Sequence, residues 1–348
     1  MKETAKRTFL AALIVLTVVV AALALWKLRL LLALLFLAFI VAASMRPSVE
    51  ALRRRGVPRG IGIALHYLAI AGFFALLLWL VVPIAVDQVQ AAVGGNALRN
   101  EASHSTGWKH QALVSLDRWL KDLPRTGGLV SHLLSATKLG FEVVIGIFFV
   151  FASAAYWIFE RNRVIALVLL LVSNEKRRVV RDTWDLIDLK LGAYVRGQLL
   201  LIAAVATVLS LCFWAIGLPY WVLVGTFAGI VEIVPVIGPL AAGALAIGVG
   251  FTQSWHLALA AGLILLTVRL LEDYLVIPKV LGDAVGLSPL FVLFSVTATA
   301  LLFGGFAVLL AIPLAAVVAT LISVVVLNKD PADEDVPAVL FSAKDAEG

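Results

Sequence analysis

Long apolar runs recur along the whole chain, and they constrain its fold more than any other feature. Several runs reach 17 residues or more, and a helix of such length is able to cross a hydrocarbon core of roughly 30 Å. Composition agrees, because 62% of the residues are hydrophobic, only 14% are charged, and the mean hydropathy is +1.04. Soluble domains are far less apolar, so we expect an all-α, polytopic integral membrane protein.

About eight segments are apolar enough to enter a membrane, and some of them are expected to be broken or re-entrant. They are residues 9–26, 30–44, 61–86, 139–172, 197–216, 220–250, 256–277 and 289–327. Only residues 27–29 separate the first two, which predicts a tight helical hairpin. The last segment is too long for one straight span, and Gly304, Gly305 and Pro313 predict a break that provides a hinge.

The N-terminal segment has two possible interpretations. Lys2, Lys6 and Arg7 precede its apolar run, a pattern that is also typical of a secretory signal peptide. We favour a membrane helix, because no small-residue cleavage site follows and a second apolar run begins almost at once. The single cysteine, Cys212, lies within an apolar run, so the chain has no disulfide framework.

Basic residues predict the orientation in the membrane. They crowd two short connections, residues 46–59 and 176–181, and such connections are typically cytoplasmic. Both termini are then cytoplasmic, and the loop of residues 87–138 faces outward. Apolar side chains at helical intervals suggest short amphipathic helices in this loop. Its role as a gate or assembly domain, or as a plain solvated loop, stays open.

Five parts follow from this topology. They are an N-terminal hairpin with a basic loop (1–60), two membrane segments with the outward loop (61–172), an amphipathic cytoplasmic helix (173–196), a C-terminal transport core with broken helices (197–327) and a disordered acidic tail (328–348). Apolar residues at intervals of three and four support the amphipathic helix, which we interpret as interfacial or as packing between subunits. These residues are Val180, Trp184, Ile187, Leu191 and Tyr194.

Enzyme motifs are weak or missing. Ser288 lies in a G-x-S element such as an intramembrane serine protease contains, but Ser288 followed by Pro289 is more typical of a helix N-cap. No zinc-protease motif, cysteine cluster or P-loop occurs in the sequence. We therefore expect a protein that is not an enzyme, with no metal, no cofactor and no nucleic-acid partner.

Residues 232–239, EIVPVIGP, are the most informative polar interruption. An ionised carboxylate near the membrane centre costs on the order of 2.5 to 3.5 kcal/mol, and Glu232 has no basic neighbour one helical turn away. Pro235 and Pro239 remove backbone donors and Gly238 permits unusual dihedrals, so the helix is expected to break between the two prolines. Exposed backbone is tolerated only along a protein-walled or watered cavity. The stretch predicts an ion, proton or substrate site; a packing carboxyl beside a simple kink is the alternative.

A second polar group follows later in the chain. Arg269 and Asp273 are four residues apart, so they are expected to face the same side of a helix and neutralise each other. Pro278 follows shortly after. These residues belong either to the same site or to the point where the chain leaves the membrane.

Four motifs in this order resemble one family of bacterial membrane proteins. They are YVRGQ (194–198), EIVPVIGP (232–239), DYLVIPK (273–279) and GLSPL (286–290), and the chain is similar through them to the autoinducer-2 exporter family, or PerM-type permeases. The resemblance implies a multi-pass inner-membrane protein that forms homo-oligomers. It also implies a role in export of autoinducer-2 or in exchange of sodium or lithium for protons. By motif, the implied site residues are Arg196, Gln198, Glu232, Pro235, Gly238, Pro239, Asp273 and Pro278. Val236 and Ser288 depart from the family pattern, in which an aromatic residue and a histidine are common.

Three functional hypotheses result. In an antiporter, Glu232 binds a proton and a monovalent cation in turn, carbonyls freed by Pro235 and Pro239 complete the ligand shell, and the region from Arg269 to Asp273 adjusts the charge. In an exporter of a small polar solute, Arg196 and Gln198 supply hydrogen bonds near the inner mouth. The alternative is a structural or regulatory oligomer that transports nothing. In each case the lipid bilayer is a partner.

Overall fold

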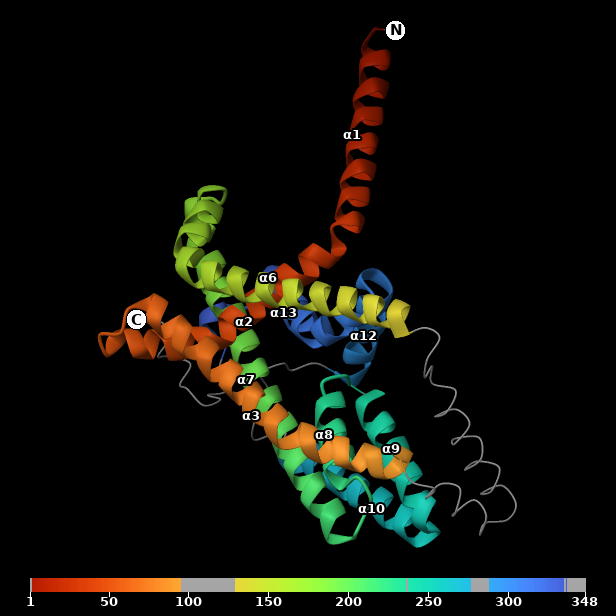
Figure 1. The fold of residues 1–348 in the computed structure, drawn as a ribbon. Helices are drawn as coiled ribbons and strands as arrows, with labels where there is room; N and C mark the ends of the chain where they lie inside the picture. Colours follow the sequence, from red (N-terminus) through yellow and green to blue (C-terminus); the bar gives the residue numbers. More distant parts are fainter. Residues whose placement is uncertain (1, 95–128, 236, 277–287, 335, 337–348) are drawn as a thin grey trace.

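All regular structure among the described residues is helical. The computed structural model describes residues 2–94, 129–235, 237–276, 288–334 and 336. Its helices are α1 (Lys2–Lys27), α2 (Arg29–Arg54), α3 (Arg59–Gly94), α6 (Leu129–Leu170), η1 (Asn174–Lys176), α7 (Arg177–Ala215), α8 (Trp221–Val231), α9 (Ile237–Gln253), α10 (Trp255–Leu271), η2 (Glu272–Val276), α12 (Pro289–Phe303), η3 (Gly305–Leu310), α13 (Ala311–Val325) and η4 (Pro331–Asp333). Figure 1 shows their arrangement.

Four helical stretches of the described chain are long and apolar enough to cross a membrane. They are Arg29–Arg54, Phe141–Leu170, Asn174–Ala215 and Gly305–Val325. Several shorter apolar helices accompany them, among them α8, α9 and parts of α1, α3 and α12. The expectation of a polytopic all-α membrane protein is therefore confirmed.

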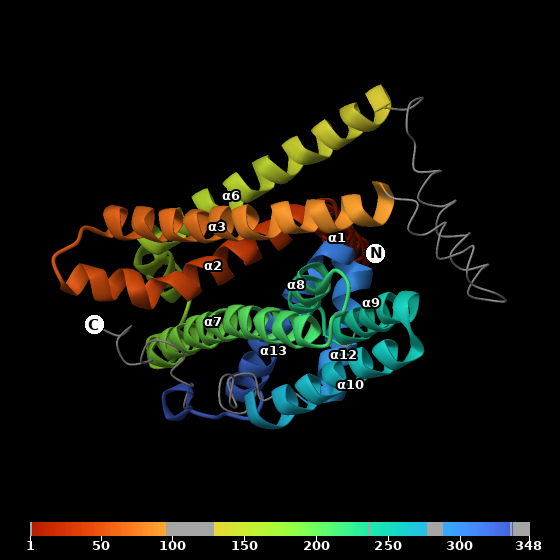
Figure 2. The same ribbon diagram turned by 60° about the horizontal axis from the view of Figure 1, so that its bottom comes forward.

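One long helix, α7, joins the two halves of the structure. It runs for 39 residues without a break, so the amphipathic segment and the membrane segment expected on either side of residue 196 are one continuous helix. Its first half packs against α2, α6 and α13, and its second half packs against α8 and α10. In Figure 2, α7 runs as one helix with α8 and α13 next to it.

The first half of α7 crosses α2 at close range. At this crossing Gly192 faces the backbone of Ala43, and an added Cβ would lie 2.6 Å from the Ala43 carbonyl oxygen. Leu191, which is fully buried, packs there with Ile40 and Leu310. Only glycine permits this approach, so residue 192 sets the distance between the two helices.

The second half of α7 forms a compact unit with α8, α9 and α10. Small residues allow α8 to lie against α7. A Cβ added at Gly225 would lie 2.3 Å from the Ser210 hydroxyl, and a Cβ added at Gly229 would lie 2.6 Å from the Ala206 Cβ. This spacing of two glycines four residues apart is a common device for close helix packing in membranes. Phe213 is fully buried in the core of the unit.

Two expected segments are divided, as the sequence predicted. Residues 220–250 form two helices, because α8 ends at Val231 and α9 begins at Ile237. With 11 residues, α8 is roughly 16 Å long, too short to cross a bilayer alone. Residues 289–327 are interrupted as expected at Gly304, whose φ of 93° lies in the left-handed region. Pro313 lies inside the first turn of α13 and does not form the break.

The two ends of the described chain differ in how they pack. α1 extends away from the other helices (Figure 1), and its apolar residues are largely exposed. In the acidic tail, η4 lies against α7, because Asp330 pairs with Arg178 and Glu334 with Lys190. The outward loop expected at 87–138 lies mostly outside the described residues, although α3 extends to Gly94 and α6 begins at Leu129.

Candidate functional site

A turn between α8 and α9 carries the interrupted motif. Glu232 follows the last residue of α8, and two turn hydrogen bonds tighten the connection, from Ile233 N–H to the Ile230 carbonyl and from Val234 N–H to the Val231 carbonyl. α9 then runs beside α8, so that the two form a helical hairpin (Figure 1).

Gly238 is required by this hairpin. A Cβ at this position would lie only 2.1 Å from the carbonyl oxygen of Val231 and 3.2 Å from the Cα of Glu232. No side chain fits at the first distance, and the blocking atom is backbone that cannot rotate away. The absence of a side chain at Gly238 therefore allows the two helix ends to approach each other closely.

The break lies earlier than the sequence indicated. It extends from Glu232 to Pro235 among the described residues, whereas Pro239 sits in the first turn of α9. A proline is well tolerated there, because the first N–H groups of a helix have no partner within it. The carbonyls of Val234 and Pro235 accept hydrogen bonds from Gly238 N–H and Ile237 N–H, so each retains only a second lone pair for a ligand.

Three acidic side chains surround one arginine beside this turn. Arg269 contacts the carboxylate of Glu232 through Nη1, and the same nitrogen lies 3.3 Å from Glu272 Oε2. Its Nη2 lies 3.0 Å from Asp273 Oδ1, which is the ion pair that their four-residue spacing indicated. We call Glu232, Glu272, Asp273 and Arg269 the carboxylate cluster. The cluster has three carboxyl groups and one cation.

One helix C-terminus lies at the carboxylate cluster. α8 ends next to Glu232, whereas α10 passes directly into the π-helical turn η2 after Leu271. The partial negative charge of a helix C-terminus favours a cation, and the guanidinium of Arg269 lies close to this end of α8 because it contacts the Glu232 carboxylate. The helix terminus and the acidic side chains therefore both favour a positive charge at this site.

The four side chains of the cluster differ in exposure. The side chains of Glu272 and Glu232 are 5% and 11% exposed, whereas those of Arg269 and Asp273 are 31% and 41% exposed. The two glutamates are therefore the more buried members of the cluster.

Two polar residues of α7 were expected near this site, and the structure separates them. The Gln198 amide donates to the backbone carbonyl of Glu232 at 3.5 Å. Arg196 faces the other way, and its Nη1 donates to the Ser44 carbonyl of α2 at 3.1 Å. Gln198 therefore supports the helix break, and Arg196 supports the contact between α2 and α7.

The remaining expected residues lie elsewhere. Pro278 falls outside the described residues. Gly304 and Gly305 form the junction between α12 and η3, and η3 packs against α12, α13 and α2. Ser288 caps α12, since its hydroxyl accepts from Phe291 N–H at 3.3 Å, which confirms the helix-cap interpretation of that motif.

Sequence reasoning missed a second charged group. Arg161 of α6 donates through Nε to Asp188 of α7 at 2.5 Å and also contacts Asp185, while Arg46 of α2 lies 3.3 Å from Asp188. Arg46 was assigned to a basic loop, but it lies within helix α2. Residues up to 142 positions apart meet here, so no local pattern revealed the contact. Asp188 is 3% exposed, and its Oδ1 has no hydrogen-bond partner in the described part of the chain.

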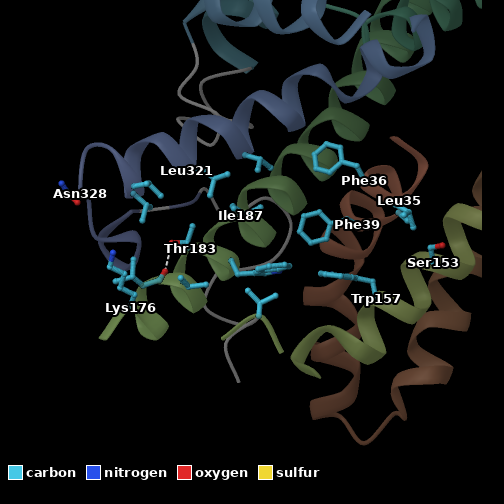
Figure 3. A pocket seen from close by; sticks show the side chains of 18 residues that line it. Leu35, Phe36, Phe39, Ser153, Trp157, Lys176, Thr183, Ile187, Leu321 and Asn328 are labelled. Atoms are coloured by element: carbon cyan, nitrogen blue, oxygen red, sulfur yellow. Dashed lines mark hydrogen bonds between the residues drawn. The ribbon is translucent and has the colours of Figure 1, made fainter. Parts of the chain in front are cut away.

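Two large cavities lie apart from the carboxylate cluster. A polar cavity of ≈ 820 Å³ adjoins the second charged group, with Arg46, Arg161 and Glu334 among its lining residues. An apolar cavity of ≈ 890 Å³ lies between α2, α6, α7 and α13 (Figure 3). No member of the carboxylate cluster lines either of them, which agrees with a cluster held closed by its own ion pairs.

Comparison with known proteins identifies the chain's relatives. Residues 10–327 match the family model described as "AI-2E family transporter". Two curated proteins of Bacillus subtilis (strain 168) are similar over most of their length. "Putative transport protein YueF" is 28% identical over 298 residues, covering 78% of this chain and 78% of that protein. "Putative transport protein YrrI" is 23% identical over 300 residues, covering 81% of this chain and 83% of that protein.

Proposed function

Because this chain belongs to the AI-2E transporter family, we propose that it is a secondary or facilitated transporter whose solute site is the carboxylate cluster. One observation carries the proposal. Three carboxylates converge on a single arginine beside a broken helix, at the point where α8 ends. Such an arrangement is typical of ion sites near the middle of transporters.

The charge of the cluster favours a cation over an anion. Three carboxyl groups of the cluster share one cation, and buried carboxylates within a membrane are costly unless a positive charge compensates them. A proton on Glu232 or Glu272, or a bound Na⁺ or Li⁺, would supply that charge. Carboxylate and backbone carbonyl oxygens are the ligands that hard cations prefer.

Exchange of a cation for a proton follows from competition at the same oxygen atoms. In the closed arrangement Arg269 compensates Glu232 and Glu272. When Arg269 turns toward Asp273 alone, the two glutamates are left to bind either a proton or a monovalent cation. Binding of one excludes the other, and alternating exposure of the site then couples the two gradients.

Export of a small polar solute is the second candidate function. The matching family, described as "AI-2E family transporter", agrees with it, since the sequence motifs resemble those of the autoinducer-2 exporter family. The cluster offers both donors and acceptors, and Gln198 lies beside it. Arg196 would act in this version as a structural residue at the α2–α7 contact.

The proposal also includes assembly into homo-oligomers in a bacterial inner membrane, with both termini cytoplasmic. The apolar residues of α1 support it, because many of them are exposed and α1 packs mainly against α2. Examples are Phe9, Leu16 and Leu23, which are 70%, 62% and 61% exposed. Lipid or a neighbouring subunit is needed to cover them.

The deciding experiment uses purified protein in liposomes that contain a pH-sensitive dye and hold an imposed proton gradient. Sodium or lithium is added outside, and wild type is compared with Glu232→Gln. We expect the cation to dissipate the gradient with wild type and not with the variant. The matched control is Glu175→Gln, which changes an exposed carboxylate outside the cluster and should behave as wild type.

Other outcomes separate the remaining hypotheses. If wild type does not respond to either cation although intact protein is incorporated, antiport is rejected and uptake of labelled autoinducer-2 into inverted vesicles is measured next. If neither solute moves, the protein acts without transport, as a structural or regulatory oligomer.

A further inference from the structure

The apolar cavity between α2, α6, α7 and α13 has a distinct lining at each end. Its volume of ≈ 890 Å³ is in the upper part of the range for small-molecule sites. Lys176 and Asn328 lie at one end, and Phe36 and Trp157 lie at the other (Figure 3). The cavity is therefore amphipathic, with a cation and an amide facing an aromatic and aliphatic interior.

Aromatic rings form one wall of the interior. The rings of Phe39 and Trp157 meet edge to face with centroids 5.1 Å apart. Trp157 also stacks on Trp184 at 5.9 Å, with an interplanar angle of 16°. These rings come from α2, α6 and α7, so they hold each other in position and give the wall a fixed shape. A flexible apolar chain can lie along such a wall.

Trp184 extends the aromatic wall, since its ring also lines the cavity. Its Nε1 is covered by protein and has no acceptor among the residues that the structure describes. A ligand in the cavity would therefore contact the indole ring and not its N–H.

Lys176 provides the charge at the polar end. It is exposed and forms no ion pair with any described residue. It lines the cavity together with Val168 and Val325, which lie near the ends of the candidate membrane spans Phe141–Leu170 and Gly305–Val325, so its ammonium group is expected near the membrane surface. Trp184 lies eight residues further along, on the order of 12 Å deeper along the helix.

We propose that this cavity binds one anionic phospholipid. Its phosphate pairs with Lys176, and an acyl chain lies against Phe36 and Phe39. Charge complementarity distinguishes this occupant from a second copy of the chain, since an apolar helix would leave Lys176 without a partner. The proposal is independent of the transported solute.

Native mass spectrometry of the purified full chain tests the selectivity for the head group. Phosphatidylglycerol and phosphatidylcholine with identical acyl chains are added to delipidated protein, and the retained lipid is counted. We expect wild type to prefer phosphatidylglycerol by about fivefold, the ratio that one basic residue near an anionic phosphate contributes. Lys176→Glu should abolish this preference, and Lys176→Arg should keep it.

Charge reversal at a second basic site gives the matched control. Arg55→Glu changes another exposed cation that does not line the cavity, and it should keep the wild-type preference. The proposal is overturned if Lys176→Glu keeps the preference, or if Arg55→Glu removes it equally, because the lipid then responds to net charge alone.

Filling the cavity tests the acyl-chain site. Val180→Trp places a large ring in the lining, and Leu199→Trp adds the same ring on an exposed part of α7. Only the first should lower retention of both lipids. If it changes the oligomeric state instead, the cavity is a subunit interface and the lipid proposal fails.

A fluorescence measurement covers the case in which Val180→Trp does not fold. Phosphatidylglycerol brominated along its acyl chains should quench wild-type tryptophan emission more than that of Trp184→Phe. Equal quenching of the two proteins would contradict the proposal.

Discussion

Arg269, in the last turn of α10, contacts the carboxylate of Glu232, the residue that follows α8, although 37 residues separate them in the chain. The contact closes the hairpin of α8 and α9 against α10. The contact also compensates the charge of an acidic residue in an apolar segment. The compensating cation comes from another helix rather than from the next helical turn.

Removing this arginine should make the protein's stability depend on cations. Arg269→Gln leaves Glu232 and Glu272 without their shared partner, so bound Na⁺ is expected to replace it. If Na⁺ reaches about 100 times its dissociation constant, the gain is about 2.7 kcal/mol. Thermal unfolding in NaCl and in choline chloride measures the difference. Arg55→Gln is the control, and an equal Na⁺ effect in both variants would contradict the cation site.

Adding one methyl group at the hairpin should disrupt it. In Gly238→Ala the new Cβ would meet the Val231 carbonyl at 2.1 Å, whereas in Gly243→Ala it would meet Leu265 Cδ2 at an ordinary 3.9 Å. We expect the first change to lower the unfolding free energy by about 1–3 kcal/mol and the second to leave it nearly unchanged. Denaturant unfolding in micelles compares them; similar losses would show that the hairpin is not closed as described.

Disrupting the second charged group should lower the unfolding free energy more than disrupting an ion pair on the surface. Arg161→Met removes the closest partner of the buried Asp188, which is expected to cost about 3–5 kcal/mol. Arg163→Met, two residues further along, removes only an exposed pair with Glu160 and should cost less than about 1 kcal/mol. The double variant Arg161→Met with Asp188→Leu should recover part of the loss. If it recovers none, the charges are not coupled.

Acid should release the tail from α7. The pKa of Asp330 is lowered because its carboxylate accepts the Ala332 N–H and pairs with Arg178. The contact therefore stabilises the docked tail above the ordinary carboxyl pKa of about 3.9 and is lost as the pH falls through the lower value of the docked state. A spin label at Ala332→Cys, in a Cys212→Ala background, should gain mobility over that acidic range. In Arg178→Gln it should do so at higher pH, and identical midpoints would contradict the pairing.

Local patterns in the sequence predicted the elements better than the contacts between them. Apolar periodicity and length predicted the membrane helices, and Ser288–Pro289 predicted the start of α12, because these signals depend on neighbouring residues. Pro235 and Gly238 indicated a break in the helix. They did not indicate that the chain reverses its direction there, since the reversal depends on how α9 packs against α8. The Arg161–Asp188 contact depends on the packing of α6 against α7, which neither residue's neighbours indicate.

The unbroken course of α7 has a mechanical consequence. Asp188 and Gln198 are ten positions apart on this one helix, the first bound to Arg161 of α6 and the second to the backbone of Glu232. A straight helix transmits rotation about its axis with little loss. Any tilt or twist that accompanies a change at the charged contacts of Asp188 must therefore displace the turn at Glu232 as well, and α7 acts as a lever between them.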